Sequence, residues 1–355
     1  MVVSSLVKQS GRVGFGFIDP AREVVSTLLR RSISTSSSQL DMEQVDLGVS
    51  KILPEQDFTG LVKSGALGEA AITRKTETLK RLKDHDISPV DVEWCCVGGN
   101  KEPIPHKSMK QVASAALNPS AWKYPASNSL SDESQQLLAS TVSTLQGRSV
   151  PPNQVAISAS RLKVFIGFFA NFAPPGDFVV HGPTYPGTLA NLLKVAHGRR
   201  NVYVVNKPFS EFCEFVNKKR HDLGLVTFAT QGNPNPTKLT EEDAAHWNAV
   251  SQGLNASVLV DGAYDGLLPV PTPKFISTDS SPTSGMKVHA ISSAKVLNVA
   301  NGPAIYMSNK DTIAFLQKAE AGMITAGSTL ALEQTLANME HVDIAAYQKT
   351  LKAQT

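Results

Sequence analysis

Short runs of β-branched and other apolar residues alternate with longer amphipathic segments through most of this chain. We expect strands at residues 92–97, 154–158, 177–181, 202–205, 225–229, 258–260 and 288–291. We expect helices at residues 132–145, 161–171, 188–196 and 241–252. Because parallel strands are usually joined by a helical crossover, this alternation predicts an α/β fold with a mostly parallel sheet. Ligands of such sheets bind at the carboxyl ends of the strands.

The composition of the chain argues against nucleic acid, a membrane or a metal ion as its partner. The 355 residues are 41% hydrophobic and 18% charged, as in a globular protein with a large core. A formal net charge of +3 favours neither nucleic acid nor an anionic membrane as a partner, and the apolar runs are far shorter than a membrane span. The three cysteines (Cys95, Cys96 and Cys213) give neither a disulfide framework nor a metal-ligand spacing, so we expect no metal site.

The first forty residues differ from the rest. Residues 1–40 contain four arginines, only two acidic residues and a serine-rich run that follows Arg30 and Arg31. This composition resembles an organelle transit peptide, with the mitochondrion as the first choice. The alternative is a disordered extension with no targeting value, which would leave a cytoplasmic protein. Residues 41–90 are polar and are expected to form a helical N-terminal segment.

Two predicted strands lead into single ionisable residues. Asp261 follows the apolar run 258–260, and Lys295 comes soon after the run 288–291. A carboxylate and an amine on one edge of a sheet are what pyridoxal 5'-phosphate chemistry requires. The amine forms a Schiff base with the cofactor, and the carboxylate keeps the pyridine nitrogen protonated. The pair therefore predicts a pyridoxal phosphate site.

Further polar and aromatic residues follow other predicted strands. Ser158, Ala159 and Ser160 precede a helix, where free N–H groups favour a phosphate, although serine-rich helix caps are common. Tyr185 could stack on a flat ring or be an ordinary half-buried tyrosine. Asn235 lies between two prolines that hold the backbone extended, in a loop that could also be a simple turn.

These motifs, in this order, resemble those of class I/II aminotransferases, the fold-type I pyridoxal phosphate enzymes. The resemblance covers residues 92–310. It rests on the family's "PGD…P-x-Y", "NP-x-NPT", "D-x-x-Y" and lysine motifs, which correspond here to residues 175–185, 233–237, 261–264 and 292–295. The second of these motifs is one residue shorter in this chain. It implies a three-layer α/β large domain at residues 91–320. A partial C-terminal small-domain segment would occupy residues 321–355, because only sixty residues follow Lys295.

The resemblance also implies roles for individual residues. Lys295 would bind the cofactor covalently and shuttle the proton, Asp261 would pair with the ring nitrogen, and Tyr185 would stack on the ring. The remaining implied contacts are Asn235 and Tyr264 with the phenolic oxygen, Ser158, Ala159, Ser160 and Ser292 with the phosphate, Gly98 with the substrate carboxylate, and Tyr124 with a neighbouring subunit's phosphate. The family builds each site from two subunits, which implies a homodimer.

One departure from the family pattern bears on the phosphate. Where family members carry a phosphate-binding arginine eight residues after the lysine, this chain has Pro303. Proline cannot replace a guanidinium, so phosphate binding should be weaker unless Arg161, Lys163 or a neighbour compensates.

The resemblance implies an aminotransferase that uses an amino acid and a 2-oxo acid as its small-molecule partners. A C–S lyase or alliinase-like eliminating enzyme would use the same lysine and aspartate. A catalytically impaired pseudoenzyme of the same fold is the third alternative. The retention of Lys295, Asp261, Asn235 and Tyr264 together favours an enzyme, whereas Pro303 and the short tail favour the pseudoenzyme.

Overall fold

The computed structural model describes residues 49–52, 104–118, 130–197, 199–232, 238–267, 271–276, 285–299, 302–323, 329–346 and 348–349. All of them belong to one compact unit, Val45–Thr355. The segments predicted at residues 1–40 and 92–97 lie outside the described residues.

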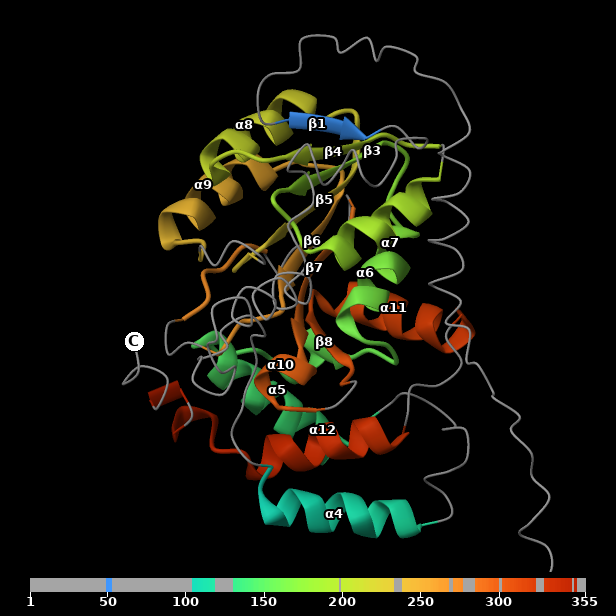
Figure 1. Ribbon diagram of the computed structural model, residues 1–355, viewed down its shortest axis with the longest axis vertical. Coiled ribbons are helices and arrows are strands. Elements are labelled where there is room, and N and C mark those ends of the chain that lie inside the picture. Colours follow the sequence, from blue (N-terminus) through green and yellow to red (C-terminus); the bar gives the residue numbers. More distant parts are fainter. Residues whose placement is uncertain are drawn as a thin grey trace, which may run out of the picture. The chain divides into compact units, whose positions relative to one another are not determined.

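The described part of the chain is built on one eight-stranded sheet (Figure 1). Its strands run in the order β1-β4-β3-β5-β6-β7-β8-β2, and those from β4 to β7 are parallel. β8 is antiparallel to both β7 and β2. Their bounds are β1 (Val49–Ile52), β2 (Val155–Ile157), β3 (Asp177–His181), β4 (Val202–Val205), β5 (Leu223–Ala229), β6 (Ser257–Gly262), β7 (Lys287–Ser292) and β8 (Ala304–Met307). The prediction of an α/β fold with a mostly parallel sheet is confirmed.

One short strand replaces part of a predicted helical segment. β1 lies within residues 41–90 and pairs antiparallel with the edge strand β4, from Val49 opposite Val205 to Ile52 opposite Val202. The helical prediction is therefore wrong for these four residues. The strand forms because its backbone N–H and C=O groups pair with the open edge of β4. The local sequence does not reveal this pairing. Residues 53–90 lie outside the described part.

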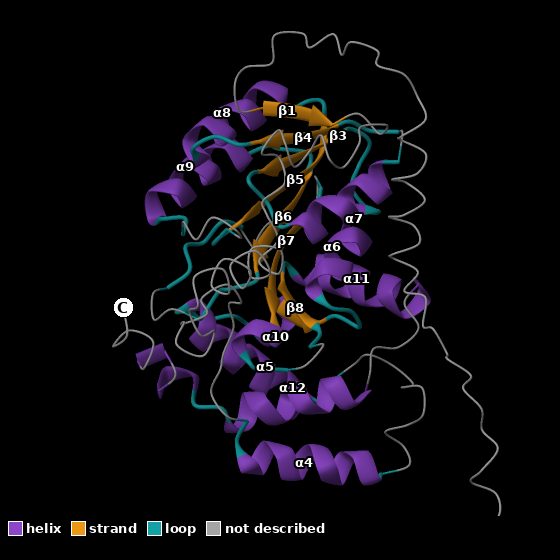
Figure 2. Ribbon diagram, viewed as in Figure 1, coloured by secondary structure: helices purple, strands orange, loops and turns teal. Residues whose placement is uncertain are grey.

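Helices cover both faces of the sheet, as Figure 2 shows. Their bounds are α4 (His106–Leu117), α5 (Asp132–Gln146), α6 (Leu162–Ala170), α7 (Pro186–Ala196), α8 (Phe209–Lys219), α9 (Glu241–Ser251), α10 (Ser293–Val296), α11 (Lys310–Met323) and α12 (Thr329–His341), with a 3₁₀ turn at Pro152–Gln154. None of the helices in these described ranges is long and apolar enough to span a bilayer.

The alternation of side chains along β8 shows how the layers are held. Ala304 and Tyr306 join a core with α6, α7 and α11 on one face, and Phe165 of α6 stacks on Tyr306 at 4.7 Å between ring centroids. Ile305 and Met307 point to the other face and join a core with α5 and α12. Further along that face, α8 and α9 pack on β5. Because strand side chains alternate, each strand contributes to both cores, which gives the predicted three layers.

α12 lies within the segment predicted to be a small-domain remnant. It packs on α4, where the Ser108 hydroxyl donates to the Ala337 carbonyl oxygen at 3.0 Å and His341 Nε2 lies 3.1 Å from Gln111 Oε1. The domain boundaries predicted from the sequence stay predictions.

Candidate active site

A cavity of about 770 Å³ opens at the carboxyl ends of the parallel strands. Five of the residues predicted from the sequence line it: Tyr185, Asp261, Tyr264, Ser292 and Lys295. They come from the ends of β3, β6 and β7, which the parallel arrangement brings to one edge of the sheet. No group of three or more His, Cys, Asp or Glu side chains that could hold a metal ion occurs among the residues the structure describes.

The remaining predicted site residues fall into two groups. Ser158, Ala159 and Ser160 are described but do not line the cavity. Asn235, Gly98 and Tyr124 lie outside the described residues.

Lys295 lies on α10, immediately after β7. Its Nζ is 5.7 Å from the centroid of the Tyr264 ring, so both side chains face the same region of the cavity. Burial disfavours the charged ammonium and lowers the pKa of Lys295 below that of an ordinary lysine. A larger fraction of its amine is therefore neutral and nucleophilic at physiological pH.

Asp261 is the second-last residue of β6. Its Oδ1 accepts a hydrogen bond from the Ala263 amide at 3.0 Å, which fixes the carboxylate at the start of the following turn. Burial raises the pKa of Asp261 to about 6, and the negative charge of Asp265 adds to the rise, against the Ala263 hydrogen bond. The carboxyl is still mostly ionised at neutral pH, so it can stabilise a cationic partner.

Tyr185 caps the beginning of α7 and presents an exposed ring to the cavity. Tyr185 is 42% exposed, which leaves the face of its ring open to a ligand. Gly187 permits this position, because a Cβ there would lie 2.5 Å from the Tyr185 ring.

The sequence analysis did not identify Thr188, which also lines the cavity. Its Oγ1 is buried and has no hydrogen-bond partner in the described part of the chain. The spacing could have indicated it, because Thr188 follows Tyr185 by three residues, a distance that places two side chains on one side of a helix. A buried hydroxyl without a partner is costly to leave unsatisfied, which suggests a ligand atom as its acceptor or donor.

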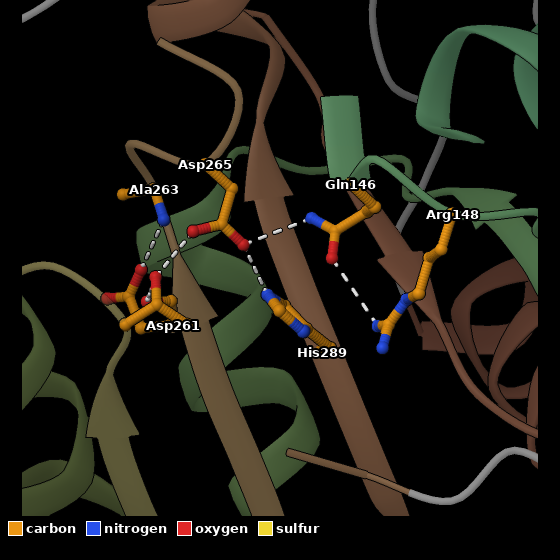
Figure 3. Close-up of polar contacts among 7 residues, drawn as sticks. Gln146, Arg148, Asp261, Ala263, Asp265 and His289 are labelled. Carbon is orange, nitrogen blue, oxygen red and sulfur yellow. Dashed lines mark hydrogen bonds and ion pairs between the residues drawn. The ribbon is translucent and has the colours of Figure 1, made fainter. Parts of the chain in front are cut away.

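Behind Asp261 lies a second buried carboxylate, Asp265, which the sequence analysis also missed (Figure 3). His289 Nε2 is 2.6 Å from its Oδ2, Thr230 Oγ1 donates to Oδ1 at 2.5 Å, and Gln146 Nε2 donates to Oδ2 at 3.1 Å. Burial alone would raise the pKa of Asp265, but His289 and these hydrogen bonds outweigh it and lower the pKa. The network anchors the turn that follows Asp261.

Gly262 makes room for this network. A Cβ at position 262 would lie 2.4 Å from Asp265 Oδ2 and 2.5 Å from His289 Nε2, closer than any real Cβ contact. The residue after Asp261 therefore has to be glycine for the Asp265–His289 contact to form.

The loop predicted to hold a phosphate is already engaged by the protein itself. Glu320, from α11, is fully buried and accepts hydrogen bonds from the Ser158 hydroxyl and, at 3.4 Å, from the Ala159 amide. Burial raises the pKa of Glu320 to about 7, although both hydrogen bonds act to lower it. Local sequence gives no sign of this contact, because its partners come from opposite ends of the large domain.

Replacing Glu320 with glutamine should change how stability depends on pH. The folded-state pKa is about 7 against 4.5 for an exposed glutamate, so the folded state binds more protons between those values. The contribution of this group to the free energy of unfolding of the wild-type protein should then fall by on the order of 2–3 kcal/mol as pH rises from 4.5 through 7. Glu320→Gln should not show this loss. Urea denaturation from about pH 5 to pH 8 measures it, with exposed Glu214→Gln as control. Parallel curves for wild type and Glu320→Gln would contradict the expectation.

Pro303 follows Gly302, which lines the cavity, and it has no side-chain donor. It is buried, and its carbonyl oxygen accepts a hydrogen bond from the Ser293 hydroxyl at 2.6 Å. The position of the usual arginine thus serves here to fix the segment between α10 and β8.

Sequence comparison gives no relatives, and structure comparison gives many. No protein-family model and no curated protein matches the chain. Among solved structures, an aminotransferase from Staphylococcus aureus matches with a TM-score of 0.58 and 19% identity, over 73% of this chain and 70% of that one. An aspartate aminotransferase from Thermotoga maritima matches with a TM-score of 0.60 and 15% identity, over 81% and 76%.

A pyridoxal phosphate-bound C–S lyase from Staphylococcus hominis matches with a TM-score of 0.57 and 13% identity, over 72% of this chain and 66% of that one. At sequence identities this low, the structural similarity shows the fold alone. The sheet order and the cavity described above agree with that fold. The chain therefore has the fold of the class I/II aminotransferases, the fold that the resemblance of its motifs implied.

Proposed function

We propose that this protein is a pyridoxal phosphate-dependent aminotransferase acting on an amino acid and a 2-oxo acid. One observation carries the proposal: Lys295, Asp261 and Tyr185, from three different strand ends, line a single cavity. Each has the environment its proposed role needs. Lys295 has a lowered pKa, Asp261 is mostly ionised at neutral pH, and the Tyr185 ring is open to the cavity.

The described residues fit the ring of this cofactor. Pyridoxal phosphate, when bound, supplies an electron-withdrawing ring that stabilises negative charge at the α-carbon of an amino acid. Asp261 would hold the proton on the ring nitrogen, Tyr185 would lie against the ring face, and Thr188 would find a partner for its buried hydroxyl. Tyr264 stands close enough to Lys295 to orient the amine.

Lys295 has two tasks in this proposal. Its amine would hold the cofactor covalently, and the free amine would act as the base that takes the proton from the α-carbon of the amino acid. The burial that lowers its pKa makes the neutral amine available as a general base near pH 7. Water exclusion by the apolar wall that includes Leu162, Ile166 and Phe209 would limit loss of that proton to solvent.

The test is cofactor binding followed by amine transfer. We expect the purified protein to develop a near-visible absorption band with pyridoxal phosphate. Adding a panel of amino acids should bleach that band with one equivalent of the matching 2-oxo acid released. Catalytic release of pyruvate from an S-substituted cysteine would indicate the eliminating reaction, in line with the C–S lyase among the structural neighbours. Absence of the band would contradict both, and a band without product would indicate a pseudoenzyme.

A homodimer and a mitochondrial location belong to the proposal as well. The first is checked by light scattering of the purified protein, and the second by imaging a C-terminal fluorescent fusion with and without residues 1–40.

A further inference from the structure

Two basic side chains on the cavity wall take no part in any interaction within the described part of the chain. Arg161 and Lys163 are both exposed and line the cavity that also holds Lys295 and Ser292. Neither side chain forms a hydrogen bond or an ion pair with a described residue. They carry two positive charges, on one helix turn, toward the space where a ligand would lie.

The backbone beneath these side chains is fixed. The Arg161 carbonyl oxygen accepts the amides of Val164 and Phe165, each at 2.9 Å. The Lys163 carbonyl oxygen accepts Asn191 Nδ2 at 2.7 Å, and the same amide nitrogen donates to Gly187 at 2.8 Å. These bonds link the first turn of α6 to α7, which begins directly after Tyr185. The helix start adds its own unpaired N–H groups and a favourable dipole for an anion.

Apart from Ser292, which lines the cavity, the phosphate donors expected from the family pattern are engaged or missing. Glu320 accepts the hydrogen bonds of the Ser158 hydroxyl and the Ala159 amide, and Pro303 has no side-chain donor. A phosphate placed against Ser158 would have to displace the Glu320 carboxyl group from both of these donors. Arg161 and Lys163 are on the cavity side, where Glu320 does not reach the wall.

We propose that Arg161 and Lys163 hold the phosphate group of the cofactor, in place of the Ser158–Ser160 loop and of the arginine that Pro303 replaces. The inference rests on the proposed function. In this proposal, phosphate recognition depends on two solvent-exposed charges, which salt can screen. The family pattern would instead use donors that the fold holds in place.

The experiment compares two ligands that differ only in the phosphate. Equilibrium dialysis gives the Kd of pyridoxal 5'-phosphate and of pyridoxal for the wild type and for Arg161→Ala/Lys163→Ala. We expect the double variant to bind pyridoxal phosphate about tenfold to a hundredfold more weakly, the loss expected for charge-assisted hydrogen bonds. Its affinity for pyridoxal should change by less than about twofold, because pyridoxal has no phosphate to lose.

A charge-matched control removes the same two charges elsewhere. Lys194→Ala/Arg199→Ala takes away exposed cations that do not line the cavity, and its affinity for pyridoxal phosphate should equal that of the wild type. Raising NaCl from about 0.05 M to 0.5 M should weaken pyridoxal phosphate binding in the wild type but not in the Arg161/Lys163 variant.

The Ser158→Ala variant tests whether the phosphate is bound by Ser158 or by Arg161 and Lys163. The proposal expects its affinity for pyridoxal phosphate to stay within about twofold of the wild type, once thermal denaturation shows that it is folded. A loss as large as that of the double variant would overturn the proposal. So would a double variant that binds pyridoxal phosphate normally, or one that loses both ligands equally. A wild type that binds neither ligand refutes the proposed function itself, so the two failures are distinct.

Discussion

Replacing Asp265 with alanine should lower the free energy of unfolding by about 3–5 kcal/mol, because three buried side chains that hydrogen-bond to its carboxylate would lose their partner. Asp265 is 4% exposed and its partner His289 is fully buried, so no water can replace the lost contacts. The change would leave the donors of Thr230 and Gln146 without their acceptor in a dry site. Urea denaturation followed by circular dichroism at pH 7.5 measures the difference.

Two further variants give this expectation its controls. Asp222→Ala removes an exposed aspartate from the loop between α8 and β5. It should change the free energy of unfolding by no more than about 0.5 kcal/mol. In a double-mutant cycle, Asp265→Ala and His289→Ala should be strongly non-additive, because each removes the same contact. Independent, additive effects would show that the 2.6 Å contact in Figure 3 does not stabilise the fold.

Replacing Lys295 with alanine should abolish covalent attachment of pyridoxal phosphate completely. After incubation with the cofactor and reduction with borohydride, the wild type should carry one cofactor-modified lysine per chain, identified as Lys295 by peptide mass spectrometry. The half-buried amine has a lowered pKa and faces the cavity, which are the two conditions for reaction with an aldehyde. Because it is not a core side chain, the variant should keep its fold.

A second lysine with a lowered pKa shows why the environment decides reactivity. Burial lowers the pKa of Lys287 to about 8, yet its Nζ donates to the carbonyl oxygens of Leu254 and Ala256 at 2.9 and 2.7 Å. These bonds hold the amine away from the cavity, so we expect no modification there. Exposed Lys194→Ala serves as the control variant and should label like the wild type. Undiminished labelling of Lys295→Ala would refute the assignment.

Much of the site could be predicted because its chemistry lies at strand ends. Asp261 and Lys295 each follow a run of buried apolar residues, and the parallel sheet brings those ends together whatever the details of packing. Tyr185 could be predicted for the same reason. The strands themselves were recognisable since the central ones are buried on both faces and read as continuous apolar runs.

The contacts that the sequence did not reveal are those between distant segments. Glu320 reaches Ser158 across most of the large domain, and nothing near either residue marks the pairing. In the sequence, His289 is a single polar residue within a strand, and only the fold shows that it contacts Asp265. β1 likewise depends on an open edge at β4. Such contacts are decided by tertiary packing, which local pattern does not record.

The position of β8 in the sheet has a consequence for biosynthesis. β2 is made early, yet its sheet neighbour is β8, so the inter-strand hydrogen bonds of β2 form only after residues 304–307 have been synthesised. Until then β2 has no neighbouring strand, and the phenylalanine-rich face of α6 has no Tyr306 to pack on. Pairings between segments so far apart form slowly and leave apolar surface exposed in the meantime. We therefore expect nascent chains that end before β8 to be retained by chaperones or to aggregate, and release to coincide with synthesis of β8, the strand that joins β2 to β7.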